Sequence, residues 1–185
     1  MPTAKDREKR QSIIDACRSM NALGINQGTS GNISLRHDEG LLITPTSTPY
    51  EAMQPEQIVF MGLDGSHDPA QRPSSEWRFH LDILKARPEI NAVVHAHPTY
   101  STILAIMNLE IPPIHYMIAC TGGDNIRVAP YATFGTQELS EHAVRALEGR
   151  LACLLEHHGM IAVGASLSKA MWLAVEVETL ARQYH

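Results

Sequence analysis

Cysteine is scarce in this sequence of 185 residues, and it has no membrane-length apolar run and no linker-like tract. The three cysteines, Cys17, Cys120 and Cys153, are odd in number and far apart, which argues against a disulfide framework and predicts reduced thiols. The segment 1–10 is charged and lacks the apolar stretch of a secretory signal. No Gly/Ser or Pro tract divides the chain, so we expect one domain over residues 1–185 in a cytoplasmic protein.

An excess of positive charge is also missing, because 15 Lys and Arg stand against 20 Asp and Glu, for a formal net charge of -5. A general basic field is thereby excluded, and with it non-specific binding to nucleic acid or to a membrane surface. An anionic substrate would have to be held by local groups. Histidine is abundant by contrast, with 10 residues, several of them close together. That pattern favours metal chemistry, because imidazole is a common zinc ligand.

The apolar periodicity predicts a mixed α/β fold. The strands are linked mostly by hairpins rather than by regular βαβ units, which disfavours a doubly wound nucleotide-binding sheet. A stretch around two prolines, 111–118, is expected to be extended. The predicted helices are 5–23, 76–84, 99–107, 137–147 and 167–184, and the predicted strands are 33–36, 41–44, 58–63, 92–97, 151–156 and 160–163.

Two histidines, His95 and His97, end the predicted strand 92–97. Residues two apart in a strand point to the same face, so both imidazoles can reach one ion. An isolated His-x-His is more often a pair of polar residues on a solvated strand. The preceding Val93-Val94 indicates a buried strand, which strengthens the metal interpretation.

A second histidine pair, His157 and His158, lies between two predicted strands. In an extended segment adjacent side chains point to opposite faces, so only one of the two can join the same ion. We favour His158, because Gly159 beside it permits an abrupt backbone turn. The alternative is that both are partly exposed loop residues.

A carboxylate, Glu76, opens the predicted helix 76–84. A first-turn carboxylate complements the helix dipole by about half a kcal/mol, and alone that explanation would suffice. With three imidazoles nearby, the carboxylate completes a nitrogen and oxygen set suited to zinc. Four protein ligands describe a closed structural site, so catalysis would require one to leave. The carboxylate is the candidate, because once displaced it is a base beside the substrate.

Two serines, Ser74 and Ser75, precede this helix. Hydroxyl and N–H groups at a helix start lie in the positive field of its dipole and can hold a phosphate. Plain capping by a serine is the commoner case and is the alternative here. The loops 28–32 and 44–47 supply further hydroxyl, amide and glycine backbone groups, although neither is a P-loop.

Five short motifs occur in the order found in the class II aldolase/adducin family, which the chain resembles over nearly its whole length. They are GNIS at 31–34, LITPT at 42–46, PSSE at 73–76, VHAH at 94–97 and HHG at 157–159. The segments SSEWRFH at 74–80, IHYMI at 114–118 and APYATFGT at 129–136 are most similar to members that act on L-fuculose 1-phosphate. The resemblance implies a single-domain, three-layer αβα fold around a mainly antiparallel sheet.

The same resemblance implies a lyase that cleaves a ketose 1-phosphate to dihydroxyacetone phosphate and an aldehyde such as L-lactaldehyde. It implies zinc bound by Glu76, His95, His97 and His158, and the substrate phosphate bound by Asn32, Thr46, Ser47, Ser74 and Ser75. Glu76 would move a proton at the enediolate carbon, and Tyr116 would donate one from the neighbouring subunit of a homotetramer. From the sequence alone, Tyr116 is a core or interface aromatic in an apolar run.

Two features depart from the family pattern. Ser47 replaces a glycine that is usual in the phosphate loop, which bears on how closely a phosphate can approach. The sequence stops at His185, where members that act on L-fuculose 1-phosphate continue into a tail that helps to cover the site. The identity of the aldehyde fragment is therefore left open.

Several related functions also stay open: an aldolase for 5-deoxyribulose or methylthioribulose 1-phosphate, a sugar-phosphate 4-epimerase and a methylthioribulose-phosphate dehydratase. The epimerases usually carry Asp where Glu76 stands, and the dehydratases match the Ser-Ser-Glu-Trp motif poorly. An adducin-like binding module would lack the metal ligands, which are intact in this chain. No lysine lies in the predicted site strands, which fits metal rather than imine chemistry.

Overall fold

The computed structural model describes residues 4–185, so residues 1–3, at the start of the charged N-terminal segment, lie outside the described part. A 7-stranded sheet has the strand order β3-β2-β1-β4-β7-β6-β5. Neighbouring strands are antiparallel except β5 and β6, which are parallel. The strands are β1 (Asn32–His37), β2 (Gly40–Ile43), β3 (Val59–Gly62), β4 (Ala92–Ala96), β5 (Arg127–Ala129), β6 (Ala152–Leu155) and β7 (Gly159–Gly164).

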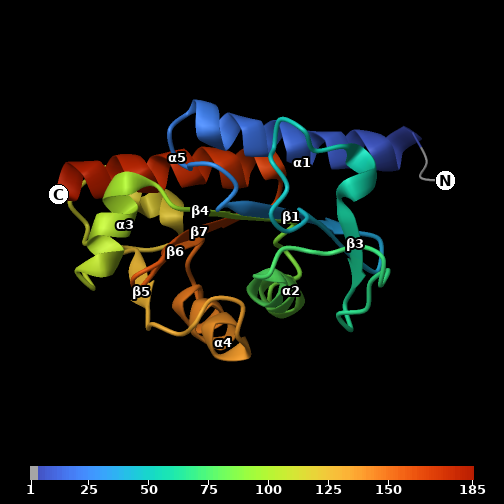
Figure 1. Cartoon of the computed structure of the whole chain (residues 1–185). Helices are drawn as coiled ribbons and strands as arrows, with labels where there is room; N and C mark the ends of the chain where they lie inside the picture. Colours follow the sequence, from blue (N-terminus) through green and yellow to red (C-terminus); the bar gives the residue numbers. More distant parts are fainter. Residues whose placement is uncertain (1–3) are drawn as a thin grey trace.

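Helices cover both faces of this sheet (Figure 1). The first layer consists of α1 (Ala4–Ala22), α3 (Thr99–Ile106) and α5 (Leu167–Tyr184), and the second of α2 (Trp77–Ala86) and α4 (Gln137–Ala146). Two short 3-10 helices, η1 (Pro55–Gln57) and η2 (Tyr116–Thr121), lie in connections. The expected three-layer arrangement around a mainly antiparallel sheet is confirmed. Within residues 4–185, no helix combines the length and the apolar character needed to cross a membrane.

The central strands are buried on both faces, because successive side chains of a strand point to opposite layers. In β4, Val93 packs with the core under α2 and α4, whereas Val94 packs with the core under α1 and α5. Each face therefore needs apolar residues, and the strand becomes a continuous apolar run instead of an alternating one. The buried strand that Val93 and Val94 predict is confirmed.

Several element boundaries differ from the expectation. β4 ends at Ala96, so His97 lies just beyond the strand. The stretch 111–118 is not extended throughout, because η2 begins at Tyr116 with Ile118 N donating to the His115 carbonyl. β5, which the apolar pattern does not predict, has only three residues, and its partner β6 lies far along the chain.

The start of α2 is also different. The helix begins at Trp77, and its N-cap is Glu76, with φ -99 and ψ 15 and no capping hydrogen bond from the Glu76 side chain. The alternative role of the two serines, as the helix cap, is not found: the Ser74 hydroxyl accepts a 3.3 Å hydrogen bond from Glu76 N, two residues on, and Glu76 is the N-cap. The Glu76 carboxylate is thus not used within its own helix and is available to the sheet above it.

Antiparallel pairing brings together the ends of three central strands. Asn32, the first residue of β1, pairs with His95 near the end of β4. Ala96, the last residue of β4, pairs with Met160 near the start of β7. Side chains that are far apart in the sequence therefore meet where these central strands begin or end, and the functional site lies there.

Candidate metal centre and substrate cavity

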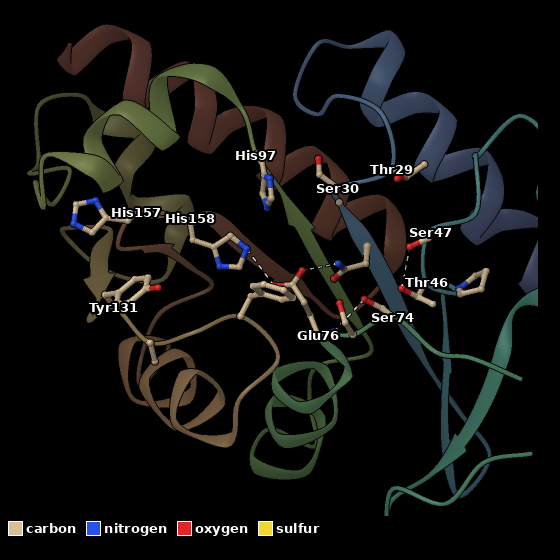
Figure 2. A pocket seen from close by; sticks show the side chains of 16 residues that line it. Thr29, Ser30, Thr46, Ser47, Ser74, Glu76, His97, Tyr131, His157 and His158 are labelled. Carbon is tan, nitrogen blue, oxygen red and sulfur yellow. Dashed lines mark hydrogen bonds and ion pairs between the residues drawn. The ribbon is translucent and has the colours of Figure 1, made fainter. Parts of the chain in front are cut away.

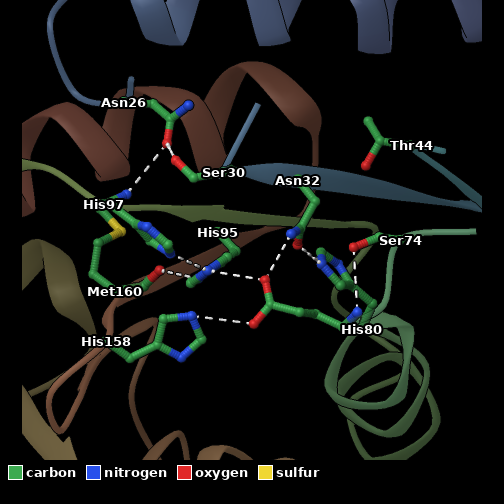
Figure 3. A network of polar contacts seen from close by, with 12 residues as sticks. Asn26, Ser30, Asn32, Thr44, Ser74, His80, His95, His97, His158 and Met160 are labelled. Carbon is green, nitrogen blue, oxygen red and sulfur yellow. Dashed lines mark hydrogen bonds and ion pairs between the residues drawn. The ribbon is translucent and has the colours of Figure 1, made fainter. Parts of the chain in front are cut away.

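Three imidazoles and one carboxylate meet at the strand ends, and we call Glu76, His95, His97 and His158 the metal cluster. The ligating nitrogens of the three histidines lie within 4.8 Å of one another, and their rings point toward one another (Figure 3). His95 Nε2 is 2.9 Å from His97 Nε2 and 3.2 Å from Glu76 Oε2. Glu76 Oε1 is 3.1 Å from His158 Nε2. The structure thus brings together the four residues expected to hold the metal.

The outer nitrogen of His95 fixes the tautomer of that ring. His95 Nδ1 lies 2.9 Å from the Met160 carbonyl oxygen, and the ring is fully buried. A carbonyl oxygen can only accept, so Nδ1 carries a hydrogen, and Nε2 is the nitrogen that faces the cluster. The same bond sets the orientation of the ring, as is usual for histidines that bind metals.

The charges of the cluster fit a bound cation. Burial, together with His95 and His158 nearby, lowers the pKa of His97 to about 3, so this ring is neutral near neutral pH. Burial alone would raise the pKa of Glu76, but the proximity of His95 and His158 outweighs it and places that pKa well below its usual range. Glu76 Oε1 is buried and accepts no backbone or hydroxyl hydrogen bond among residues 4–185, and its close polar neighbour is His158 Nε2. Imidazole nitrogens that converge with a buried carboxylate on one point form a site for a divalent cation.

The turn between β6 and β7 separates the two adjacent histidines. His157 has a left-handed φ of 56 and is exposed, whereas His158 is half-buried and reaches Glu76. We expected an abrupt turn at Gly159 to bring His158 to the cluster. That reason is wrong, because the turn falls on His157 and Gly159 is part of β7. Gly159 has a different role: a Cβ there would lie 2.6 Å from the His97 ring and 2.6 Å from the Ala96 carbonyl oxygen. Only glycine lets β7 approach the metal cluster this closely.

A cavity of about 400 Å³ opens beside the cluster, a size suited to a small ligand (Figure 2). Glu76, His97 and His158 line its middle, and Tyr131 and His157 lie on the side away from the hydroxyl groups. The residues expected to bind phosphate all line it: Asn32, Thr46, Ser47, Ser74 and Ser75. No Lys or Arg of the described chain is part of the lining, so an anion here would be held by neutral donors.

The part of the cavity lined by Thr46, Ser47, Ser74 and Ser75, which we call the hydroxyl side, has groups that differ in how many of their hydrogen bonds are already made within the protein. Ser75 is exposed, and Thr46 and Ser47 lie 3.4 Å apart at their hydroxyl oxygens. Ser47 takes a left-handed φ of 52, a conformation that glycine adopts without strain. Asn32 is more committed: its Nδ2 donates to Glu76 Oε2 at 2.8 Å, and its Oδ1 lies 2.5 Å from His80 Nε2. One amide hydrogen of Asn32 remains for a ligand.

Residues 11–185 match the family described as Class II Aldolase and Adducin N-terminal domain. The chain belongs to this family. The L-fuculose phosphate aldolase of Escherichia coli (strain K12) is 55% identical over 174 residues, which are 94% of this chain and 81% of that protein. The 5-methylthioribulose-1-phosphate/5-deoxyribulose-1-phosphate aldolase of Rhodospirillum rubrum is 54% identical over 175 residues, 95% of this chain and 79% of that protein.

A solved structure of L-fuculose 1-phosphate aldolase superposes on the present fold with a TM-score of 0.93. The two are 36% identical, and the match covers 100% of this chain and 86% of that one. The chain is thus a class II aldolase, a lyase of a metal-dependent family, and the expected family and fold class are confirmed. The metal cluster is the part of the structure that fits this dependence.

Some residues of this aldolase do not lie where the sequence alone would place a site residue. Tyr116 is 79% exposed in η2 and does not line the cavity of its own chain. Tyr131 and Phe134 do line the cavity, although the sequence showed them only as part of a similar segment. His80, fully buried behind Asn32, was not singled out either. His80 lies one helical turn after Glu76, so the two side chains share a face of α2. That spacing is the sequence feature that predicts a position for His80 near the metal cluster.

Proposed function

We propose that this aldolase reversibly cleaves a ketose 1-phosphate of the L-fuculose 1-phosphate kind to dihydroxyacetone phosphate and an aldehyde such as L-lactaldehyde. The observation that carries the proposal is one cavity that holds both the metal cluster and a row of neutral hydroxyl donors. The cluster suits a cation that binds sugar oxygens, and the hydroxyls suit a phosphate. A substrate that satisfies both is a phosphorylated ketose, which is also the substrate class in the names of the relatives.

Zinc is the metal that we propose, held by His95, His97, His158 and Glu76. Three imidazole nitrogens and one carboxylate oxygen form the borderline donor set that zinc prefers. When bound, the ion supplies Lewis-acid stabilisation of negative charge on the substrate oxygens. Glu76, at the cavity wall, is the group placed to take and return a proton at the carbon that becomes nucleophilic after the C3–C4 bond breaks.

The phosphate of the substrate is proposed to lie at the hydroxyl side, against Thr46, Ser47, Ser74 and Ser75, with the free amide hydrogen of Asn32 beside them. This side adjoins the start of α2, where the helix dipole favours an anion. Hydrogen bonds from neutral donors to a charged group contribute about 1.5–3 kcal/mol each. Several such bonds hold a phosphate without a lysine or arginine.

Tyr116 is proposed to act as the proton donor for the aldehyde oxygen in the site of a neighbouring subunit. Its exposure supports a role outside its own chain. Apolar side chains at 106, 107, 109 and 114 are also exposed nearby in the sequence, as is typical of a surface that another subunit covers. A homotetramer with sites between subunits is part of this proposal. So is a cytoplasmic location, which the free thiols of all three cysteines support.

A second candidate differs only in the aldehyde fragment. The aldolase named for 5-methylthioribulose 1-phosphate and 5-deoxyribulose 1-phosphate is 54% identical to this chain, against 55% for the aldolase named for L-fuculose phosphate. One percentage point does not decide between them. A non-catalytic binding module is disfavoured, because the four side chains of the metal cluster converge as a metal site requires.

One assay separates these functions. The protein is incubated with dihydroxyacetone phosphate and, in parallel, with L-lactaldehyde, acetaldehyde and methylthioacetaldehyde, and the condensation products are identified by mass and stereochemistry. We expect L-fuculose 1-phosphate to form fastest. Faster condensation with either of the other aldehydes would assign the second candidate, and no product with any of them would overturn the aldolase proposal. A His95→Ala variant serves as the inactive control.

A further inference from the structure

A buried chain of hydrogen bonds leads from the core to the metal cluster. Ser34 Oγ lies 2.8 Å from His80 Nδ1, and His80 Nε2 lies 2.5 Å from Asn32 Oδ1. Asn32 Nδ2 then donates to Glu76 Oε2 at 2.8 Å. Figure 3 shows Asn32 and His80 next to each other, on the side of the Glu76 carboxylate opposite His158. Ser34 and His80 are fully buried, and neither lines the substrate cavity.

The chemistry of each group allows only one direction for this chain. The Glu76 carboxylate can only accept, so Asn32 turns its NH2 group toward it and its carbonyl oxygen toward His80. That oxygen also only accepts, so His80 Nε2 carries a hydrogen. Burial lowers the pKa of His80 to about 3, so the ring is neutral and its Nδ1 is an acceptor. The Ser34 hydroxyl therefore donates to it, and every group has its one compatible state.

We propose that His80 is a positioning residue: by holding the Asn32 amide in one orientation, it fixes the Glu76 carboxylate with Oε2 toward His95 and Oε1 toward His158. This inference rests on the proposed function only in naming zinc as the ion. Without the His80 N–H, the Asn32 amide could rotate and place its oxygen against the carboxylate, where two acceptors repel each other. Glu76 would then lose the hydrogen bond that orients it.

The alternative is a histidine that only fills the core. His80 does stack on Phe79, with ring centroids 4.6 Å apart, so its removal will cost stability in either case. The two roles differ in what else changes. A core residue affects unfolding alone, whereas a positioning residue also affects the affinity for the metal and the catalytic rate at saturating substrate.

The first test compares His80→Phe, which keeps a ring but has no donor, with His80→Gln, which keeps an N–H donor. Ser101→Ala is the matched control, because it removes a buried hydroxyl whose partner, Glu178, does not belong to the metal cluster. Zinc affinity is measured by competition with a chromophoric chelator. We expect about a 10-fold loss for His80→Phe, the lower end for an outer partner of a ligand, and a small loss for His80→Gln and Ser101→Ala. In His80→Phe the kcat for cleavage should fall together with the zinc affinity, while KM changes little.

Equal zinc affinity in wild type, His80→Phe and His80→Gln, with only a lower melting temperature, would overturn the proposal. If His80→Phe does not fold, Ser34→Ala takes its place against Ser101→Ala, and equal zinc affinities would again overturn it. The second test needs neither metal nor substrate. Nitrogen NMR of the His80 ring should show a neutral Nε2–H tautomer, and an Nδ1–H tautomer or a charged ring would contradict the chain of hydrogen bonds. Zinc binding without cleavage would refute the proposed function alone.

Discussion

At the scale of single residues, His157 and His158 are chemically identical neighbours with different surroundings. His158 faces Glu76, while the left-handed turn leaves His157 exposed. We predict that His158→Ala lowers zinc affinity by more than the roughly 10–100-fold that outer partners cost, and that cleavage is lost with it. His157→Ala is the control and should keep its zinc, as measured by metal analysis of the purified protein. Similar zinc losses in both variants would show that the ligand is wrongly assigned.

His80 also gives a prediction for pH. Its pKa falls from 6.5 to about 3 on folding, because the buried ring is desolvated. Between these values the unfolded chain binds a proton at this position and the folded chain does not, so stability falls as the pH is lowered through this range. In His80→Gln this contribution is missing. Urea unfolding should show that the free energy of unfolding falls less steeply toward about pH 5 in the variant, by up to about 1.4 kcal/mol per pH unit.

The other ionisable groups, including His97, are common to both proteins, so they cancel in this comparison. Parallel pH profiles for wild type and His80→Gln would mean that His80 binds a proton as readily in the folded protein as in the unfolded chain. That result would also contradict the direction of the Ser34 to Glu76 hydrogen bonds.

At the scale of the elements, β7 must approach the end of β4 closely, and Gly159 makes this possible. A Cβ at Gly159 would lie 2.6 Å from both the His97 ring and the Ala96 carbonyl oxygen. We predict that Gly159→Ala displaces His97, lowers zinc affinity and costs about 1–3 kcal/mol of stability through overpacking. Calorimetric zinc titration and urea unfolding measure the two effects.

The control for this variant is Gly149→Ala. Gly149 has a positive φ of 66 but open space around its Cβ position, so alanine there brings backbone strain without a clash. It should lose stability and keep its zinc affinity. If Gly159→Ala also kept its zinc affinity, the close approach of β7 would not matter for the metal cluster.

The sequence predicted most elements because local patterns determine them. The hairpin of β1 and β2, the buried β4 and the amphipathic α2 and α4 follow from apolar periodicity and turn residues. It failed where the outcome depends on distant partners. β5 is a strand only because β6 lies beside it, and the Glu76 side chain at the start of α2 contacts Asn32 and His95 instead of its own helix.

At the scale of the whole molecule, the residues of the site could be predicted but not their connections. The histidine pairs and Glu76 are visible as residue types suited to zinc. The contacts of Asn32 with Glu76 and with His80 depend on how β1 packs over α2. Asn32 is 44 residues from Glu76 and 48 residues from His80 in the sequence. No short-range pattern encodes such a contact.

The proposed tetramer gives a prediction at the same scale. Tyr116→Phe and Glu76→Gln should each be nearly inactive in cleavage, the first in the proton transfer to the aldehyde oxygen and the second in that at the carbon. If Tyr116 serves a neighbouring subunit, mixing the two variants after dissociation and reassembly rebuilds some sites with both groups intact. We expect partial recovery of cleavage. No recovery in proven mixed oligomers would place Tyr116 outside the neighbour's site.

The central claim is that the metal cluster and the hydroxyl groups beside it form one site for cleaving a sugar phosphate. The most direct measurement follows the release of dihydroxyacetone phosphate from L-fuculose 1-phosphate by the purified protein, after treatment with a chelator, and after zinc is restored. We predict cleavage, then its loss, then its return at about one zinc ion per chain. Undiminished cleavage by metal-free protein, or none by protein with a full complement of zinc, would contradict the account.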